Sequence, residues 1–175
     1  HDDGGTADGG VDFSAEQVFF IDVSVINDAP SFTAGPNQTV NEDAGPQTVA
    51  GWATNVSAGP PDEAGQALAF QVVTGNPALF ATPPAISPTG TLTYTPAADA
   101  NGSTTIRVKL RDDGGSDNGG VDTSAEQTFT ITILPVNDAP TFVIPAAPVT
   151  ATGDGAVVVV PTFATSFSTG PANEA

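Results

Sequence analysis

The chain has 175 residues, and its 20 acidic side chains against only three basic ones give a formal charge of −17. Nucleic acid and anionic membrane surfaces are excluded as expected partners, because binding to either depends on clustered Lys and Arg. Cysteine is absent, which excludes disulfides, thiolate metal sites and cysteine nucleophiles, and no apolar run is long enough to predict direct membrane insertion.

The first segment of the chain recurs further along. Residues 1–30 match residues 111–140 at 18 of 30 positions, an offset of 110 residues, and a weaker match relates residues 52–64 to residues 163–175. The Ala-Pro pairs at 29–30 and 139–140 favour stiff, extended joints. These matches predict that residues 1–29 end one repeat, residues 30–138 form a complete repeat, and residues 139–175 begin a third.

Apolar side chains alternate with polar ones along four stretches of the complete repeat, and this period of two predicts strands with one buried face. Gly, Pro, Asn and Asp clusters separate the stretches, and Asn101-Gly102 and Asn118-Gly119 are typical of turns. An all-β sandwich of about seven strands is therefore expected. The single Trp52 is expected in its core. The inward residues are Leu68, Phe70, Val72, Leu92, Tyr94, Ile106, Val108, Leu110, Phe129, Ile131 and Ile133.

Several motifs occur together in this chain: INDAP (26–30), VNDAP (136–140), VNEDAG (40–45), GTLTYTPAADANG (90–102) and the DDGG loop before the last strand. In these motifs the whole chain resembles the bacterial cadherin-like tandem repeats of large surface adhesins, within the cadherin superfamily. The resemblance implies tandem seven-stranded Greek-key sandwiches with Ca²⁺ bound between successive domains by loops at their facing ends.

If the strands alternate in direction, the acidic loops of the complete repeat collect at its two ends, and they become candidate calcium ligands under this resemblance. The entry end has Asn27, Asp28, Asp62, Glu63, Asp112 and Asp113. The exit end has Glu42, Asp43, Asp99, Asn137 and Asp138, and the following repeat has Asn173 and Glu174. The simpler alternative is that these are solvated turn residues, since Asp is common in turns.

The chain departs from the cadherin pattern in two places. An additional Asp usually precedes the Asn-Asp pair, but Val25-Ile26 and Pro135-Val136 occupy those positions. The Asp-Arg-Glu triplet between the fifth and sixth strands is missing, and Asp99 is the only carboxylate nearby. These departures predict one or two ions at a junction instead of three.

The three basic residues, Arg107, Lys109 and Arg111, alternate along one strand and therefore project from one face. A ligand-binding stripe is one interpretation, and an exposed face whose cations pair with local carboxylates is the favoured one. His1 is the only histidine. A Ser-His-Asp triad and a histidine metal site therefore have no support, and the chain is not expected to be an enzyme.

The leading functional hypothesis is a structural spacer of an extracellular, cell-surface or secreted adhesin, in which calcium stiffens the joints between neighbouring repeats. The alternative is a direct binding module for surface glycans or identical chains, and the assembly of such chains into filaments is a further possibility. A polysaccharide pulldown separates the two hypotheses, because a chain that acts only as a spacer would show no selective retention.

Overall fold

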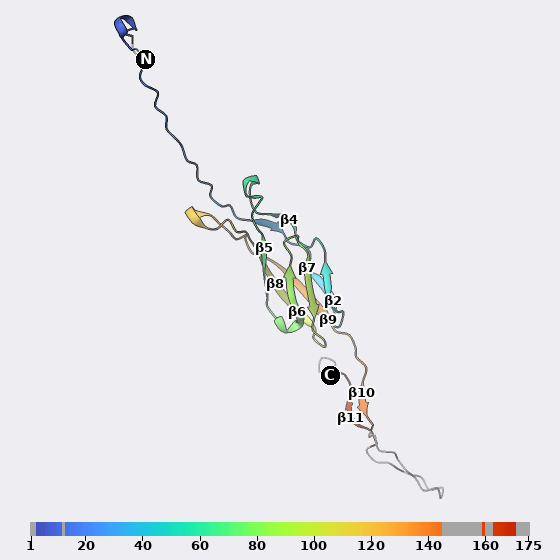
Figure 1. Ribbon diagram of the computed structural model, residues 1–175. Helices are drawn as coiled ribbons and strands as arrows, with labels where there is room; N and C mark the ends of the chain where they lie inside the picture. The colour runs from blue at the N-terminus through green and yellow to red at the C-terminus, as the bar shows by residue number, and fades with distance from the viewer. Residues whose placement is uncertain (1–2, 12, 145–158, 160–162, 171–175) are drawn as a thin grey trace.

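The computed structural model describes residues 3–11, 13–144, 159 and 163–170. An extended segment, residues 14–30, leads to one end of a β-sandwich, and the chain leaves the sandwich from the opposite end (Figure 1). We call these the entry end and the exit end. The described residues contain no α-helix, and the expected all-β fold is confirmed.

The sandwich contains nine short strands and three 3₁₀ turns. The strands are β1 (Ser31–Thr33), β2 (Gln38–Asn41), β3 (Gln47–Val49), β4 (Thr54–Ser57), β5 (Ala69–Thr74), β6 (Phe80–Ile86), β7 (Leu92–Pro96), β8 (Gly102–Arg111) and β9 (Gln127–Leu134). The turns are η2 (Pro61–Glu63), η3 (Pro77–Leu79) and η4 (Asp117–Gly119). One sheet has the order β2-β9-β8-β5, a second has β3-β7-β6, and β1 pairs with β4.

Nine strands replace the expected seven because the first two strands are interrupted. Between β1 and β2 stands Pro36, which has no N–H to offer a neighbouring strand. The Trp52 indole N–H donates to the Pro36 carbonyl at 3.0 Å, and a Cβ at Gly35 would lie 2.3 Å from the Trp52 carbonyl oxygen. After this break, β2 crosses to the other sheet and pairs with β9 in parallel, with Gln38 opposite Ile131.

The hydrophobic core lies between the facing sides of the two sheets. Ile106, Leu110 and Ile131 are fully buried, and Trp52 packs on Phe129 with ring centroids 4.3 Å apart. The predicted inward residues of β7, β8 and β9 are all buried, and those of β5 are partly buried against the core. The predicted strand phase and the core position of Trp52 are therefore confirmed.

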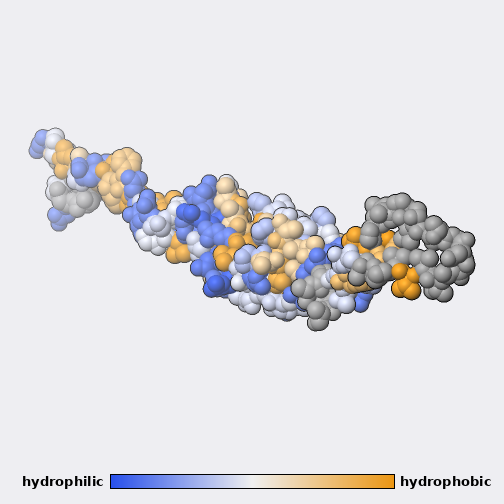
Figure 2. Space-filling model, turned by 90° about the horizontal axis from the view of Figure 1, so that it is seen from below, coloured by the Kyte–Doolittle hydropathy of each residue, from blue (hydrophilic) through white to orange (hydrophobic). Residues whose placement is uncertain are grey.

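The extended segment before β1 presents the same apolar pattern to solvent. Phe19 and Ile21 correspond to Phe129 and Ile131 at the repeat offset of 110 residues, yet they are 79% and 77% exposed. Orange patches mark this segment on the molecular surface (Figure 2). An alternating apolar pattern is therefore not enough to bury these side chains. Their burial requires neighbouring strands.

Local structure recurs at the repeat offset. The turn η1 (Ala7–Gly9) has Asp8 at φ 57°, and the turn η4 has Asn118 at φ 55°. Each is closed by the N–H of the glycine that follows it, Gly10 or Gly120. The pair formed by β10 (Thr141–Val143) and β11 (Thr165–Ser168) is antiparallel, as is the β1–β4 pair. The division of the chain into three repeats stays a prediction.

Candidate functional site

Three aspartates converge at the exit end. Asp43 follows β2, Asp99 lies between β7 and β8, and Asp138 lies in the segment that leaves β9. One carboxylate oxygen from each lies within 4.8 Å of the others. Asp43 and Asp99 have φ of 60° and 54°, a left-handed conformation that Asp adopts more readily than most residues. We call this group the exit cluster.

Glu42 joins the exit segment to the sandwich. Its side chain is 1% exposed, and its carboxylate accepts the Val136 N–H at 2.8 Å. Its own N–H donates to the Leu134 carbonyl at 2.9 Å. The exit segment is therefore held beside the loop that supplies Asp43. The amide of Asn137 donates to the neighbouring Asp138 carbonyl.

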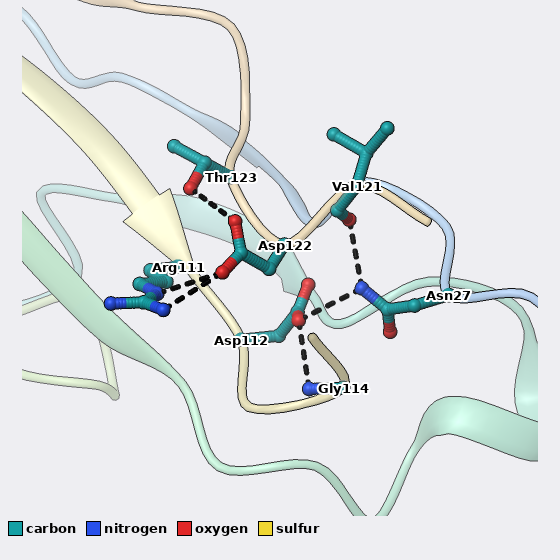
Figure 3. Close-up of polar contacts among 7 residues, drawn as sticks. All are labelled: Asn27, Arg111, Asp112, Gly114, Val121, Asp122 and Thr123. Carbon is teal, nitrogen blue, oxygen red and sulfur yellow. Dashed lines mark hydrogen bonds and ion pairs between the residues drawn. The ribbon is translucent and has the colours of Figure 1, made fainter. Parts of the chain in front are cut away.

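At the entry end, Asn27 is enclosed by the long loop between β8 and β9 (Figure 3). Its side-chain N–H₂ donates to the Asp112 carboxylate at 3.0 Å and to the Val121 carbonyl at 2.8 Å. Its side-chain oxygen accepts from the Gln66 amide at 2.7 Å. A Cβ at Gly114 would lie only 1.8 Å from that oxygen, so this close approach requires glycine.

A second contact at the entry end involves Glu63, which is 7% exposed. One oxygen of its carboxylate accepts the Asp28 N–H at 2.9 Å. The other oxygen is buried and has no hydrogen-bond partner among the described residues, and the same is true of Asp112 Oδ2 and Gln66 Oε1. Glu63 and Gln66 line one cavity of about 350 Å³ together with Asp62. Buried oxygens of this kind are rare unless an ion or a water satisfies them.

The remaining candidate residues lie apart from these two groups. Asp113 accepts the Ala67 N–H at 2.8 Å with its side chain exposed, which stabilises the β8–β9 loop. Asn173 and Glu174 lie outside the described residues. Gln66 and Gly114 were missed from sequence, because neither type of side chain is characteristic of a metal site. The one sequence feature that could have indicated them is their position in the two acidic loops of the entry end.

The positive charges do not neutralise these carboxylates. Arg111 forms an ion pair with Asp122 at 2.8 Å. The hydrogen bond from Thr123 and those from Arg111 lower the pKa of the Asp122 carboxyl below its ordinary value. Within the described ranges, Arg107 and Lys109 form no ion pair, so the expectation of local pairing is met only at Arg111.

Two comparisons with known proteins bear on this arrangement. A family model described as a bacterial Ig domain matches residues 27–133, which is more than half of the chain. No curated protein matches the sequence. The described part of the chain also contains no helix of the length and apolarity that crossing a membrane would need.

Proposed function

We propose that this chain, which belongs to the bacterial Ig domain family, is a structural spacer of a large extracellular surface protein and that calcium stiffens its joints. Domains of this family are structural and non-enzymatic, and they usually occur outside the cell or on its surface. The calcium role, the adhesin context and the closer relationship to cadherin-like repeats are the parts that we infer.

The observation that carries the proposal is the exit cluster. Its three carboxylates come from three separate segments, so ordinary sequence proximity does not explain why they meet. No described residue donates a hydrogen bond to the side chain of Asp43 or Asp99. Three negative charges within 4.8 Å repel one another, and a cation among them would remove that cost. Oxygen ligands in an irregular arrangement suit Ca²⁺ better than Mg²⁺, which demands near-octahedral geometry.

The entry end supports the proposal independently. Glu63 and Asp112 each use one oxygen to hold the entry segment and keep the other buried without a hydrogen-bond partner among the described residues. A cation or a water bound there would satisfy those oxygens, which otherwise carry a desolvation cost. Among the described residues, however, only the exit cluster brings three carboxylates within reach of one ion, so the entry oxygens are a secondary argument for a cation.

The contacts at the two ends can be combined into one arrangement for the joint between successive repeats. The Asn-Asp pair occurs at residues 27–28 before the sandwich and at residues 137–138 after it. Asn27 is held by the domain that follows the pair, whereas Asp138 meets carboxylates of the domain that precedes it. If every joint combines both arrangements, the asparagine fixes the linker to the domain that follows. The aspartate would then be a ligand to the calcium ion at the exit end of the domain that precedes.

The recurrence of local structure supports a tandem arrangement. The η1 and η4 turns share their unusual backbone angles, and β10 pairs with β11 as β1 pairs with β4. This is the basis on which residues 1–29 are assigned to a preceding repeat and residues 139–175 to a following one. The repeated Asn-Asp-Ala-Pro motif then marks each boundary.

The proposal is tested by calorimetric titration of the chain with Ca²⁺ at physiological ionic strength. We expect dissociation constants on the order of 10⁻⁴–10⁻³ M, which is typical of extracellular modules. Asp99→Asn preserves the shape and the left-handed backbone of its position, so a loss of about tenfold or more in exit-site affinity would reflect the lost charge. Asp117→Asn, in an exposed turn, is the matched control. Equal titrations for the two variants would contradict the proposal.

The stiffening itself requires a chain with at least two complete repeats. Small-angle scattering should give an extended particle with calcium and a shorter or more flexible one with a chelator, while circular dichroism shows unchanged strand content. A maximum dimension that does not respond to chelation would leave calcium binding without a mechanical role.

A further inference from the structure

All three basic side chains of this acidic protein lie on the outer face of one strand, β8. In the pairing of β8 with β5, Gln71 lies opposite Lys109 and Val73 lies opposite Arg107. On the other side, Thr128 of β9 lies opposite Arg107. The face therefore presents amide, hydroxyl and aliphatic groups around two cations, and Glu126 adds one carboxylate to the cavity that they line.

Two of these cations are available to a ligand. Arg111 is bound to Asp122 by two hydrogen bonds from its guanidinium group. The side chains of Arg107 and Lys109 have no ion pair or hydrogen bond with any described residue. Two positions apart on one strand, they project in the same direction and their Cα atoms are roughly 7 Å apart. We call this pair the β8 cation pair.

The cation pair lines a shallow cavity of about 290 Å³, whose other walls are Gln71, Val73 and Glu126. The volume suits one sugar ring. The polar walls provide hydrogen-bonding groups for hydroxyls, and Val73, which is 54% exposed, provides an aliphatic surface for the ring. Arg binds carboxylates through two parallel hydrogen bonds, so the cations select a ligand with a carboxylate.

We propose that the β5-β8-β9 face binds a carboxylated saccharide, a uronate unit of a surface glycan, with its carboxylate on Arg107 and Lys109. A second copy of this chain is the less favoured occupant, because two molecules with a charge of −17 each repel as they approach. Arg107 lies four residues, roughly 13 Å, from the end of β8. At physiological ionic strength the acidic entry end is largely screened over that distance.

The test is binding of the chain to an oligogalacturonate, with the methyl-esterified oligomer as the uncharged probe, measured by calorimetry in the presence of a chelator. The chelator prevents calcium from bridging acidic loops to the saccharide, so the result does not depend on the proposed calcium sites. The free acid should bind and the ester should not, and affinity should fall as salt is added.

Two variants locate the binding. Arg107→Gln combined with Lys109→Gln should weaken binding by about tenfold or more, as expected for the loss of two ionic contacts. Arg111→Gln removes a cation from the same strand that is already paired, and it should change affinity by less than about twofold. Circular dichroism should show that both proteins retain the fold, since all three side chains are on the outer face.

Several outcomes would overturn the proposal. The first is equal binding of the acid and its ester, and the second is no binding of either to the wild-type chain. The third is saccharide binding that occurs only with calcium and is unaffected by the double substitution, which would assign it to the acidic ends. The fourth is self-association in low salt that the double substitution abolishes, which would make a second copy the occupant.

Discussion

The entry and exit ends of the sandwich carry similar numbers of acidic residues, but they use them differently. At the entry end, Glu63 and Asp112 are buried, and each accepts a hydrogen bond from the segment that precedes the domain. At the exit end, the side chains of Asp43 and Asp99 are exposed, lie close to the Asp138 carboxylate and accept no hydrogen bond from any described residue. The entry end is thus already organised by neutral donors, whereas the exit cluster is the group for which we propose a neutralising cation.

This difference predicts that the two ends respond to different changes. Removing a hydrogen-bond donor should weaken the entry end whatever the calcium concentration. Removing a charge should weaken the exit end only when calcium is present. The core between them contributes to both ends, because β8 and β9 connect the entry loop to the exit segment.

The largest effect should come from the core, because damage there removes the frame that both ends share. Ile131 is fully buried in β9, so Ile131→Ala should lower the free energy of unfolding by about 2–5 kcal/mol. Thr130→Ala, on the opposite face of the strand, should change it by less than about 0.5 kcal/mol. Urea denaturation measures both. Equal losses at the two positions would mean that the strand phase is wrong.

An intermediate effect is expected from Asn27→Ala, which removes the donor to Asp112 and the acceptor of Gln66. A buried carboxylate that loses a hydrogen bond costs about 1–3 kcal/mol, and this loss should be equal in calcium and in chelator. Asn137→Ala is the matched control, since among the described residues that amide donates only to its neighbour's carbonyl. A loss that appears only in calcium would make Asn27 a metal ligand instead of a hydrogen-bonding anchor.

A smaller, calcium-dependent effect is expected from Asp43→Asn. With calcium at about ten times its dissociation constant, a bound ion contributes roughly 1.4 kcal/mol to stability, and this variant should lose most of that. In chelator it should be at least as stable as the wild-type chain, because one repulsive charge is gone. Thermal unfolding with calcium and with chelator separates the contribution of ion binding from that of charge repulsion. Loss of stability in chelator would show that Asp43 has a structural role.

The smallest effect concerns Asp122, beside the entry loop. The folded state holds the pKa of this carboxyl below its ordinary value of 3.8, through hydrogen bonds from Thr123 and then Arg111. Its contribution to stability is therefore complete above the unfolded pKa and is lost as the pH falls through the folded one. Carbon-detected NMR titration of Arg111→Gln should show the pKa rising towards 3.8. No change would assign the whole shift to Thr123.

The sequence predicted the features that depend on local periodicity or on strand direction. Alternation placed Ile106, Phe129 and Ile131 inside, and alternating strand direction predicted that Asp99 and Asp138 would lie at the same end. The parallel pairing of β2 with β9 was not predicted, because it follows from the break at Pro36 and a change of sheet. Such a pairing joins residues more than 90 positions apart, which no local pattern encodes.

Asn27 has a hydrogen-bonding role that the sequence did not predict. Its place in an acidic junction makes it a candidate oxygen ligand, and in the structure both ends of its amide are engaged by Asp112, Val121 and Gln66. Asparagine donates as well as accepts, and its residue type does not indicate which function is used. Only the packing of the loop around it, with glycine at position 114, decides between them.

The parallel pairing of β2 and β9 determines how this domain would carry a load. β9 adjoins the exit linker, and β2 is joined to the entry linker through β1, so tension applied through the linkers would pull β2 towards the entry end and β9 towards the exit end. The two strands would then slide along each other in shear, and the hydrogen bonds over the four registered pairs from Gln38–Ile131 to Asn41–Leu134 would resist together instead of opening one at a time. The pairing of β2 with β9 would therefore also resist tension along the chain.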